Sequence, residues 1–345
     1  MTEPRMASAV PIATAESPSF AGAAPAVSVV VSSHSRASLL AGLLDALAAQ
    51  DHPDFEVVVS DNGSEDGTWQ VLTERCAQDA LRLRALRLAF HDGPAVPRNT
   101  AIAQSRAPLI AFTDDDCLPT PGWLTGLVGA FDDSIDIVQG RTSPEPGGWA
   151  GPWGRSLDVP NPSGLYETAN LALRRDAFVR AGGFGAKRLL SGRAFGEDVV
   201  LGATVAATGG FRFAPDAQMH HRVMPGTYAS FVSERRRLAG FPQLLRLVPQ
   251  LRSRAYLGVF LGKRRAITDL GVAGFLVAVG LAAAQLWVGL VALLLMLPWG
   301  RTLWREAVGY PGAPRPVRAM QLLVADVVGC AALVSGSVRA RRLLL

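Results

Sequence analysis

The stretch LIAFTDDDCLPTPGWL, residues 109–124, joins an apolar run typical of a buried strand to three consecutive carboxylates, Asp114, Asp115 and Asp116. Like charges placed side by side repel, so a partly enclosed cluster of this kind is stable when a cation or several donors neutralise it. Surface turns also collect aspartates. The stretch therefore predicts either a solvated turn or a metal site at the end of a buried strand.

Short apolar runs alternate with helical patterns around this stretch. VSVVVSS (27–33) and FEVVVSD (55–61) are continuous and β-branched, whereas the leucines of residues 39–47 recur at helical spacing. Such alternation predicts an α/β fold with a doubly wound parallel sheet, whose ligands bind beyond the carboxyl ends of the strands. Because polar clusters follow several of these strands, we expect a site at that edge. The clusters are Ser32 to Arg36, Asp61 to Asp66 and Asp114 to Asp116.

The 345-residue chain is 49% hydrophobic and 18% charged, which is more apolar than a soluble enzyme requires. The excess is concentrated in residues 267–299 and 319–338. Each stretch is long enough to cross a bilayer, which takes about 20 apolar residues in a helix. Buried core helices are the alternative, but such stretches without a charged stripe are unusual in water. We expect two or three spans in a multi-pass protein of the cell (inner) membrane.

The formal net charge of +5 is concentrated beside these apolar stretches. Lysines and arginines cluster in residues 252–265, 301–318 and 339–342. An excess of such residues beside spans favours the cytoplasmic side, where anionic headgroups attract them. We therefore expect a cytoplasmic N-terminal domain, a membrane partner and no nucleic-acid partner, while the number of spans stays open.

Composition divides the chain into four parts. Residues 1–25 are rich in Ala, Pro and Ser and are expected to be a disordered leader. Residues 26–240 carry the α/β pattern, residues 241–266 form a basic amphipathic juxtamembrane segment, and residues 267–345 form the transmembrane region. The three cysteines lie far apart in the sequence and predict reduced thiols rather than disulfides.

A ligand that carries a diphosphate would explain several polar residues. It calls for a divalent cation on carboxylates, which Asp114 to Asp116 could supply, and for basic groups at a helix N-terminus, where Arg98 follows Pro97. Asp61 could accept from a base or a ribose, or could form an Asx-turn with Asn62. The Pro97 region could equally be a capped helix without a ligand.

Transfer of a group to a hydroxyl would further require a general base. Glu197 and Asp198 begin a predicted helix and are candidates, although helix N-termini attract acids for dipole reasons alone. The pair His220 and His221 ends a predicted strand and could ligate a metal, donate to a phosphate or lie on the surface. For His221 we favour the surface role.

Seven ordered motifs resemble those of the family 2 glycosyltransferases, inverting enzymes with the GT-A fold, over about residues 27–221. The motifs are VSVVVSSHSR, VVVSDNGSEDGT, GPAVPRNTAIAQS, LIAFTDDDCLPTPGWL, ANLALRRDAFVRAGGF, GEDVVLGATVAATGG and the strand ending in His220. The resemblance implies a Rossmann-like, mostly parallel sheet with flanking helices, here followed by C-terminal transmembrane helices. It also implies a nucleotide-sugar donor and Mg²⁺ or Mn²⁺. The membrane anchor adds the expectation of a lipid-linked or glycan acceptor.

The same resemblance implies a role for each matching position. Asp198 would be the catalytic base with Glu197 beside it, and Asn170 would lie on the acceptor side. A DxD-type element, Asp114 and Asp116, would carry the metal, and His220 could approach it. The expected donor-binding residues are Ser33, His34, Arg36, Asp61, Arg98, Asp114 and Asp115.

The sequence departs from the family pattern at two places. Val200 and Thr204 stand where relatives often have a further acid and an arginine. The QxxRW signature of processive synthases is replaced by SERRRLAGF, so we expect a single sugar transfer rather than polymerisation. A nucleotidyltransferase is a competing interpretation, but SSHSRAS lacks the glycines of its phosphate loop. The other is a silent membrane-anchored nucleotide-sugar-binding or scaffold protein, in which the acidic motifs would be eroded.

Overall fold

The computed structural model describes residues 8–185, 195–283 and 296–344. The chain divides into two compact units. The first unit comprises Met1–Gly148, Ser156–Lys187 and Gly196–Val223. The second comprises Trp149–Arg155, Arg188–Phe195 and Met224–Leu345.

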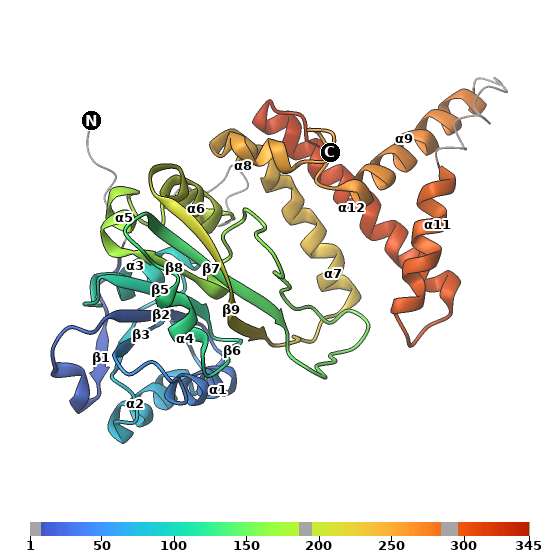
Figure 1. Cartoon of the computed structure of the whole chain (residues 1–345). Helices are drawn as coiled ribbons and strands as arrows, with labels where there is room; N and C mark the ends of the chain where they lie inside the picture. The colour runs from blue at the N-terminus through green and yellow to red at the C-terminus, as the bar shows by residue number, and fades with distance from the viewer. Residues whose placement is uncertain (1–7, 186–194, 284–295, 345) are drawn as a thin grey trace. The chain divides into compact units, whose positions relative to one another are not determined.

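A mixed sheet of nine described strands forms the first unit (Figure 1). Its strand order is β1-β4-β3-β2-β5-β8-β7-β9-β6. The strands are β1 (Ala13–Glu16), β2 (Val27–Ser33), β3 (Phe55–Asp61), β4 (Leu83–Arg87), β5 (Leu109–Asp114), β6 (Cys117–Pro119), β7 (Ile135–Pro144), β8 (Leu171–Arg174) and β9 (Gly210–His221). From β4 to β5 the neighbours are parallel, as predicted, whereas β8 is antiparallel to both of its neighbours. The sheet is thus parallel from β4 to β5, with antiparallel pairs on both sides of these strands.

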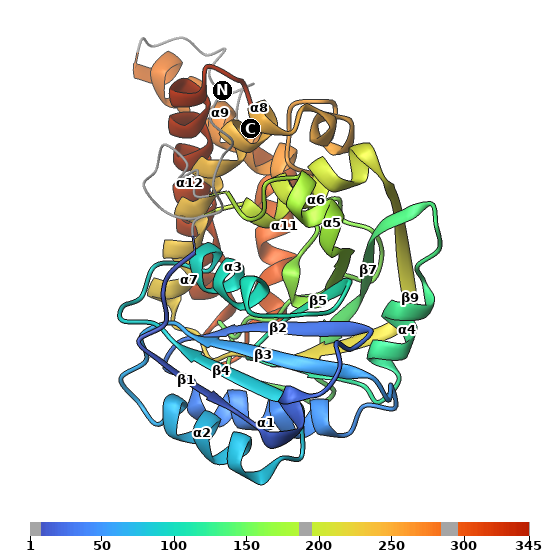
Figure 2. The same cartoon turned by 90° about the vertical axis from the view of Figure 1, so that its left-hand side faces the viewer.

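Helices cover both faces of this sheet (Figures 1 and 2). The helices are α1 (Ala37–Ala48), α2 (Thr68–Gln78), α3 (Ala95–Ala103), α4 (Trp123–Gly129), α5 (Arg175–Arg180) and α6 (Glu197–Thr208). Side chains alternate along a strand, so Val29 and Val31 pack with α1, α2 and α4, whereas Val30 packs with α3, α5 and α6. Burial on both faces explains why β2 is continuously apolar.

The leader expected to be disordered over residues 1–25 contains ordered structure. Ala13–Glu16 forms β1, which pairs antiparallel with β4, and Pro18–Ala21 forms a short 3₁₀ helix. Phe20 on this helix is buried. The prediction was wrong here because an edge strand is held by backbone hydrogen bonds, which composition does not reveal.

The second unit is helical. Its elements are α7 (Tyr228–Arg235), η3 (Arg236–Gly240), α8 (Phe241–Leu247), η4 (Pro249–Arg254), α9 (Lys263–Ala283), α11 (Met296–Glu306), η6 (Ala307–Gly309) and α12 (Arg315–Ala340). Contacts group residues 228–240 with these helices, although composition assigned them to the domain 26–240. The sequence pattern gave no boundary there because α7 and η3 are polar segments.

One helix of the described residues, α12, is long and apolar enough to cross a membrane. It contains the predicted stretch 319–338. The other predicted stretch, 267–299, begins within α9, and its residues 284–295 lie outside the described part of the chain. The described residues therefore contain one candidate span, and the multi-pass topology stays a prediction.

Candidate active site at the carboxyl edge of the sheet

The carboxyl ends of three neighbouring parallel strands bring the predicted polar residues together. In the register of β2 and β3, Ser33 lies opposite Asp61, and in that of β2 and β5, Ser32 lies opposite Asp114. Parallel strands end at the same edge, so residues far apart in the sequence become neighbours there. This edge is the candidate site.

Arg36 neutralises two members of the triple carboxylate. Its NH1 donates to Asp115 Oδ1 at 2.7 Å and to Asp116 Oδ2 at 2.9 Å, and Ser33 Oγ donates to Asp115 Oδ2 at 2.7 Å. Burial raises the pKa of Asp115, although Arg36 and Ser33 oppose this shift. Burial alone would lower the pKa of Arg36, but its two ion pairs raise it above the ordinary value. Asp115 and Asp116 are thus buried and paired, which excludes a merely solvated turn.

Arg98 provides the second cation at this edge. It lies in α3 and is buried, and its NH2 donates to Asp114 Oδ1 at 2.8 Å. The face of the Phe184 ring lies 5.6 Å from the guanidinium carbon. Asp114 remains about one-third exposed, at 33%, so it can still reach a ligand. Arg98 and Asp114 therefore present one positive and one negative group toward the same space.

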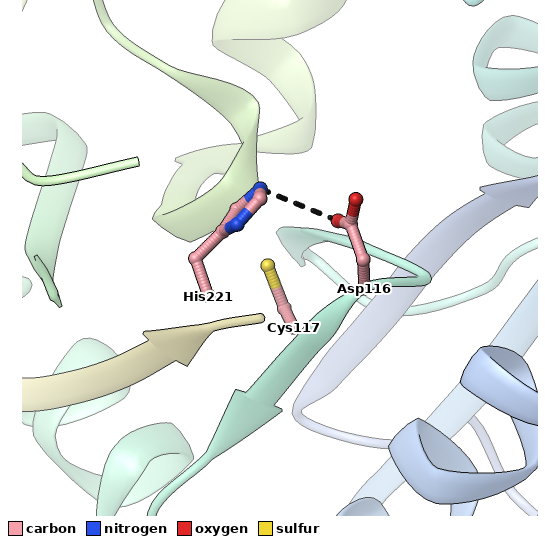
Figure 3. A group of neighbouring side chains, drawn as sticks. All are labelled: Asp116, Cys117 and His221. Atoms are coloured by element: carbon pink, nitrogen blue, oxygen red, sulfur yellow. Dashed lines mark ion pairs between the residues drawn. The ribbon is translucent and has the colours of Figure 1, made fainter. Parts of the chain in front are cut away.

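The structure brings a histidine to the third aspartate (Figure 3). Because β6 and β9 are paired, Cys117 lies opposite His221, and His221 Nε2 is 3.4 Å from Asp116 Oδ1. One ligand atom from each of Asp116, Cys117 and His221 lies within 4.8 Å of the others. Carboxylate and imidazole suit Mn²⁺, whereas burial raises the pKa of the Cys117 thiol well above its ordinary value. The donor set therefore fits a divalent cation on Asp116 and His221, with Asp114 nearby in sequence.

His220, the histidine expected near the metal, makes a different contact. Its Nδ1 lies 3.1 Å from Ser143 Oγ. Adjacent residues of a strand point to opposite faces, so His220 and His221 do not both face Asp116. The geometry favours His221 over His220 as the histidine nearest Asp116, and a metal-binding role for either stays a prediction.

Asp61 has an unused acceptor. Its side chain is fully buried, Ser64 N donates to its Oδ1 at 3.0 Å, and among the described residues its Oδ2 has no hydrogen-bond partner. Arg87 Nε lies 3.8 Å from Oδ2. A buried oxygen left without a donor is costly unless a ligand supplies one. Asp61 therefore fits the expected contact with a nucleotide base, a role that stays a prediction.

A pair of histidines lies beside Asp61. The centroids of the His34 and His91 rings are 4.1 Å apart. The backbone carbonyl oxygen of Asn62 lies 2.9 Å from His34 Nδ1, and its side-chain Nδ2 lies 2.9 Å from His91 Nδ1. Sequence reasoning included His34 and missed His91. Only the position of His91 after a predicted strand could have indicated it.

Asp198 differs from the other acids of the site. Burial raises its pKa to about 7, and the charge of Glu197 adds to this shift while that of Arg98 opposes it. Within the described residues its side chain accepts a hydrogen bond from the backbone N–H of Val199, at 2.9 Å. A carboxylate of this kind exchanges a proton near neutral pH, as a general base requires.

Glu167 was not predicted and belongs to the same neighbourhood. Its negative charge contributes to the raised pKa of Asp198. Gln139 Nε2 and Ser163 Oγ donate to its Oε2 at 2.6 and 2.8 Å. No motif marks Glu167 in the sequence, since a 3₁₀ turn, Thr168–Asn170, and long-range packing place it there.

Asn170, expected on the acceptor side, is buried and uses its amide within the protein. Trp123 Nε1 donates to Oδ1 at 2.9 Å, and Nδ2 donates to the carbonyls of Arg141 and Ala217 at 2.9 Å each. The side chain thus ties α4, β7 and β9 together. Direct contact with an acceptor stays a prediction without support from these bonds.

The mixed sheet with its flanking helices has the GT-A fold. A solved structure with the same fold is the mannosyltransferase PcManGT from Pyrobaculum calidifontis in complex with GDP-Man and Mn²⁺. It has a TM-score of 0.57 and 20% sequence identity, over 93% of this chain and 89% of that chain. Residues 28–189 match the family described as Glycosyl transferase family 2, and this match supports a glycosyltransferase domain in that part of the chain.

Curated relatives match about a third of this chain. Glycosyltransferase AglE of Haloferax volcanii is 35% identical over 121 residues, which are 34% of this chain and 39% of the relative. GalNAc(5)-diNAcBac-PP-undecaprenol beta-1,3-glucosyltransferase of Campylobacter jejuni is 28% identical over 117 residues, 34% of this chain and 38% of the relative. The matches thus span about two fifths of the length of these relatives.

Proposed function

We propose that this chain transfers one sugar, with inversion, from a nucleotide-diphosphate sugar to a hydroxyl of a lipid-linked or cell-envelope glycan. The observation that carries the proposal is that Arg98 interacts with two acidic groups in different settings, Asp114 and Asp198. Arg98 bonds Asp114 on one side, and its charge acts on Asp198 on the other. A donor site with fixed charges thus adjoins a base that titrates near neutral pH.

The donor would bind along the edge formed by β2, β3 and β5. Asp61 Oδ2 would accept from the nucleotide base, and Ser33, His34 and Arg36 would lie beside the nucleoside. Arg98 and the amides at the start of α3 would face the phosphates, since helix N-termini attract anions. Asp114 and Asp115 complete the donor contacts.

Asp114, Asp116 and His221 would hold Mg²⁺ or Mn²⁺. Bound there, the cation would neutralise charge on the departing nucleoside diphosphate. The solved mannosyltransferase with the same fold is described in complex with Mn²⁺ and GDP-Man, which supports a divalent ion here. Arg36 would contribute positive charge at the same place, because it already forms ion pairs with Asp115 and Asp116.

Asp198 would take the proton from the acceptor hydroxyl as that oxygen attacks the anomeric carbon. The bond from this carbon to the diphosphate oxygen breaks on the opposite side, so the configuration inverts. Burial is the main cause of the raised pKa of Asp198, and the negative charges of Glu197 and Glu167 add to it. The base is therefore strong enough to accept a proton and still ionised in an appreciable fraction at pH 7.

An acceptor at the membrane agrees with the composition of the C-terminal unit. The helix α12 is a candidate span, and basic residues flank the apolar stretches. One curated relative is named for an undecaprenol-linked acceptor. We place the catalytic domain on the cytoplasmic side of the inner membrane, with the stretch 267–299 as a further span.

The test compares Asp198→Asn with Glu197→Gln in the purified full-length chain. Donor binding is measured for UDP-, GDP- and dTDP-sugars with Mn²⁺ or Mg²⁺, and transfer is measured to a panel of lipid-linked glycans. Asp198→Asn should retain donor binding and lose about 10²- to 10⁴-fold in transfer, the range that a general base contributes. Glu197→Gln removes one charge as well and should lose less.

Three results would refute parts of the proposal. Near-normal transfer by folded Asp198→Asn would remove its role as base. A product with the donor's anomeric configuration would exclude inversion. Failure of the folded chain to bind any of the nucleotide sugars would favour a silent scaffold instead.

A further inference from the structure

A cavity of about 440 Å³ lies within the C-terminal unit. Residues of α7, α9, α11 and α12, which are labelled in Figure 1, form most of its wall. Three arginines line it, Arg235, Arg264 and Arg265, together with the acids Glu306 and Asp326. The cavity therefore has a cationic side, and the state of each arginine decides what it can bind.

Two of the three arginines are neutralised by carboxylates. Arg264 donates through Nε and NH2 to both oxygens of Glu306, at 2.9 and 2.8 Å, and through NH1 to Asp326 Oδ2 at 2.8 Å. Arg265 forms an ion pair with Asp269 one helical turn further along α9. These groups have their partners within the protein, so they act chiefly as structure.

Arg235 is the exception. In the described part of the chain its side chain forms no hydrogen bond and no ion pair, and its Nε is buried without a partner. Its guanidinium carbon lies 4.4 Å from the centroid of the Phe231 ring, which also lines the cavity. Burial lowers the pKa of Arg235 from its ordinary value, but an arginine remains protonated at neutral pH. The cavity thus contains a charged guanidinium whose donors have no protein partner among the described residues.

An exposed arginine needs no partner because water supplies one, and the next residue, Arg236, is in that situation. Arg235 instead has its guanidinium over Phe231, and the nearby carboxylate of Asp326 accepts a hydrogen bond from Arg264 rather than from Arg235. A buried donor without a partner destabilises the protein unless a ligand supplies an acceptor. A phosphate fits this group, since the planar guanidinium can donate two parallel hydrogen bonds to its oxygens.

The remaining wall of the cavity is apolar. Leu238, Leu261 and Leu322 line it together with Phe231. Leu322 belongs to α12, the candidate membrane span, and Val324 and Val327 of the same helix are exposed. A hydrocarbon chain attached to the phosphate would bury apolar surface here, whereas a free phosphate would not.

We propose that this cavity binds the phosphate group of an amphiphile, with Arg235 as the phosphate ligand and the leucines and Phe231 against the hydrocarbon chain. The phosphate could come from a bilayer phospholipid or from an isoprenoid phosphate. The proposal does not rest on sugar transfer, because its test measures binding alone.

The test uses native mass spectrometry of the full-length chain in detergent. The probes are dioleoyl phosphatidic acid, a C55 isoprenoid monophosphate, dioleoylglycerol as a phosphate-free match, and inorganic phosphate. Arg235→Gln should weaken binding of a phosphate amphiphile about tenfold or more, as expected for loss of a charge-assisted pair. Arg235→Lys should lose less, because it keeps the charge. Arg236→Gln is the matched control for charge, and it should bind as wild type does.

The arms of this test have distinct meanings. Binding of phosphatidic acid alone, or of the isoprenoid phosphate alone, supports the proposal and identifies the source. Equal binding of dioleoylglycerol, equal competition by inorganic phosphate, or no binding of either amphiphile would overturn it. Unchanged binding by Arg235→Gln, or equal losses with Arg236→Gln, would also overturn it. Circular dichroism and melting of each variant exclude loss through misfolding.

Discussion

The aspartates after β5 and the aspartate at the start of α6 are the same residue type in two different electrostatic settings. Asp115 accepts hydrogen bonds from Ser33 and Arg36. Asp198 accepts a backbone hydrogen bond from Val199, and among the described residues no cation donates to it. Burial raises the pKa of both carboxyl groups. At Asp115 the hydrogen bonds from Arg36 and Ser33 oppose this shift, whereas at Asp198 the negative charge of Glu197 adds to it and the pKa is about 7.

This difference indicates how one site can hold a charged ligand and also move a proton. Carboxylates paired with arginine keep their charge and their position, which suits the binding of a metal and a diphosphate. A desolvated carboxylate without such a partner changes its protonation near neutral pH. Each prediction below alters one side of this comparison.

The largest expected effect concerns the aspartates after β5, and it is the loss of metal affinity when the proposed ligand His221 is removed. His221→Ala should reduce apparent Mn²⁺ affinity about 10- to 100-fold or more, because even the loss of a residue that supports a metal ligand has that effect. His220→Ala should have a much smaller effect, since His220 contacts Ser143 instead. Titration of activity with Mn²⁺ after treatment with EDTA measures both variants. Full activity of the wild type in EDTA, or equal losses in the two variants, would contradict the assignment.

The pH dependence of transfer should follow the protonation of Asp198. With the pKa of Asp198 at about 7, kcat/KM should fall about tenfold per pH unit below pH 7 and level off above it. The groups that act on Asp198 are Glu197, Arg98 and Glu167. Glu167→Gln removes a negative charge and should shift the midpoint to lower pH. A profile that is flat between pH 5 and 8 would show that another group is the base.

The parts of the fold and site that the sequence predicts are those encoded locally. β-branched runs indicate β2, β3 and β5, and the residues that follow each run lie at the same edge because the strands are parallel. The antiparallel strand β8 and the edge strand β1 depend on backbone pairing with distant segments, which local pattern does not contain. The partners of a side chain are equally non-local, which is why Glu167 and His91 were missed.

The histidine pair illustrates the same limit within a single motif. The sequence shows two adjacent histidines at the end of a strand, and their alternation guarantees that they face opposite ways. Which of them faces Asp116 depends on the register between β6 and β9, where Cys117 pairs with His221. Pairing register is a tertiary property. The sequence could therefore indicate the histidine pair but not which of the two histidines faces Asp116.

Arg98 pairs with Asp114 and its charge acts on Asp198, so its removal should change both donor binding and the pH profile. Arg98→Gln leaves Asp114 without its cation and should raise the KM for the donor about tenfold, the effect of losing a hydrogen bond between charged groups. The positive charge of Arg98 opposes the raised pKa of Asp198, so the midpoint of the pH profile should move upward. Donor KM and the pH profile are measured on the same variant. A change in KM without a shift of the midpoint would separate Arg98 from Asp198.

The smallest expected effect is on stability, and it has a defined sign. The folded-state pKa of Asp198 is about 7 against an ordinary value of 3.8, so between these pH values the folded protein holds a proton that the unfolded chain has released. Stability therefore falls as pH rises from about 4 to about 7 and loses nothing further above that. Asp198→Asn removes this penalty, so it should raise the melting temperature by a few degrees at pH 8 and by much less at pH 4. Scanning calorimetry in EDTA measures this difference without bound metal. An equal gain at both pH values would mean that the Asp198 carboxylate is not strained by burial, and the contrast with Asp115 would then have to arise when the substrate binds.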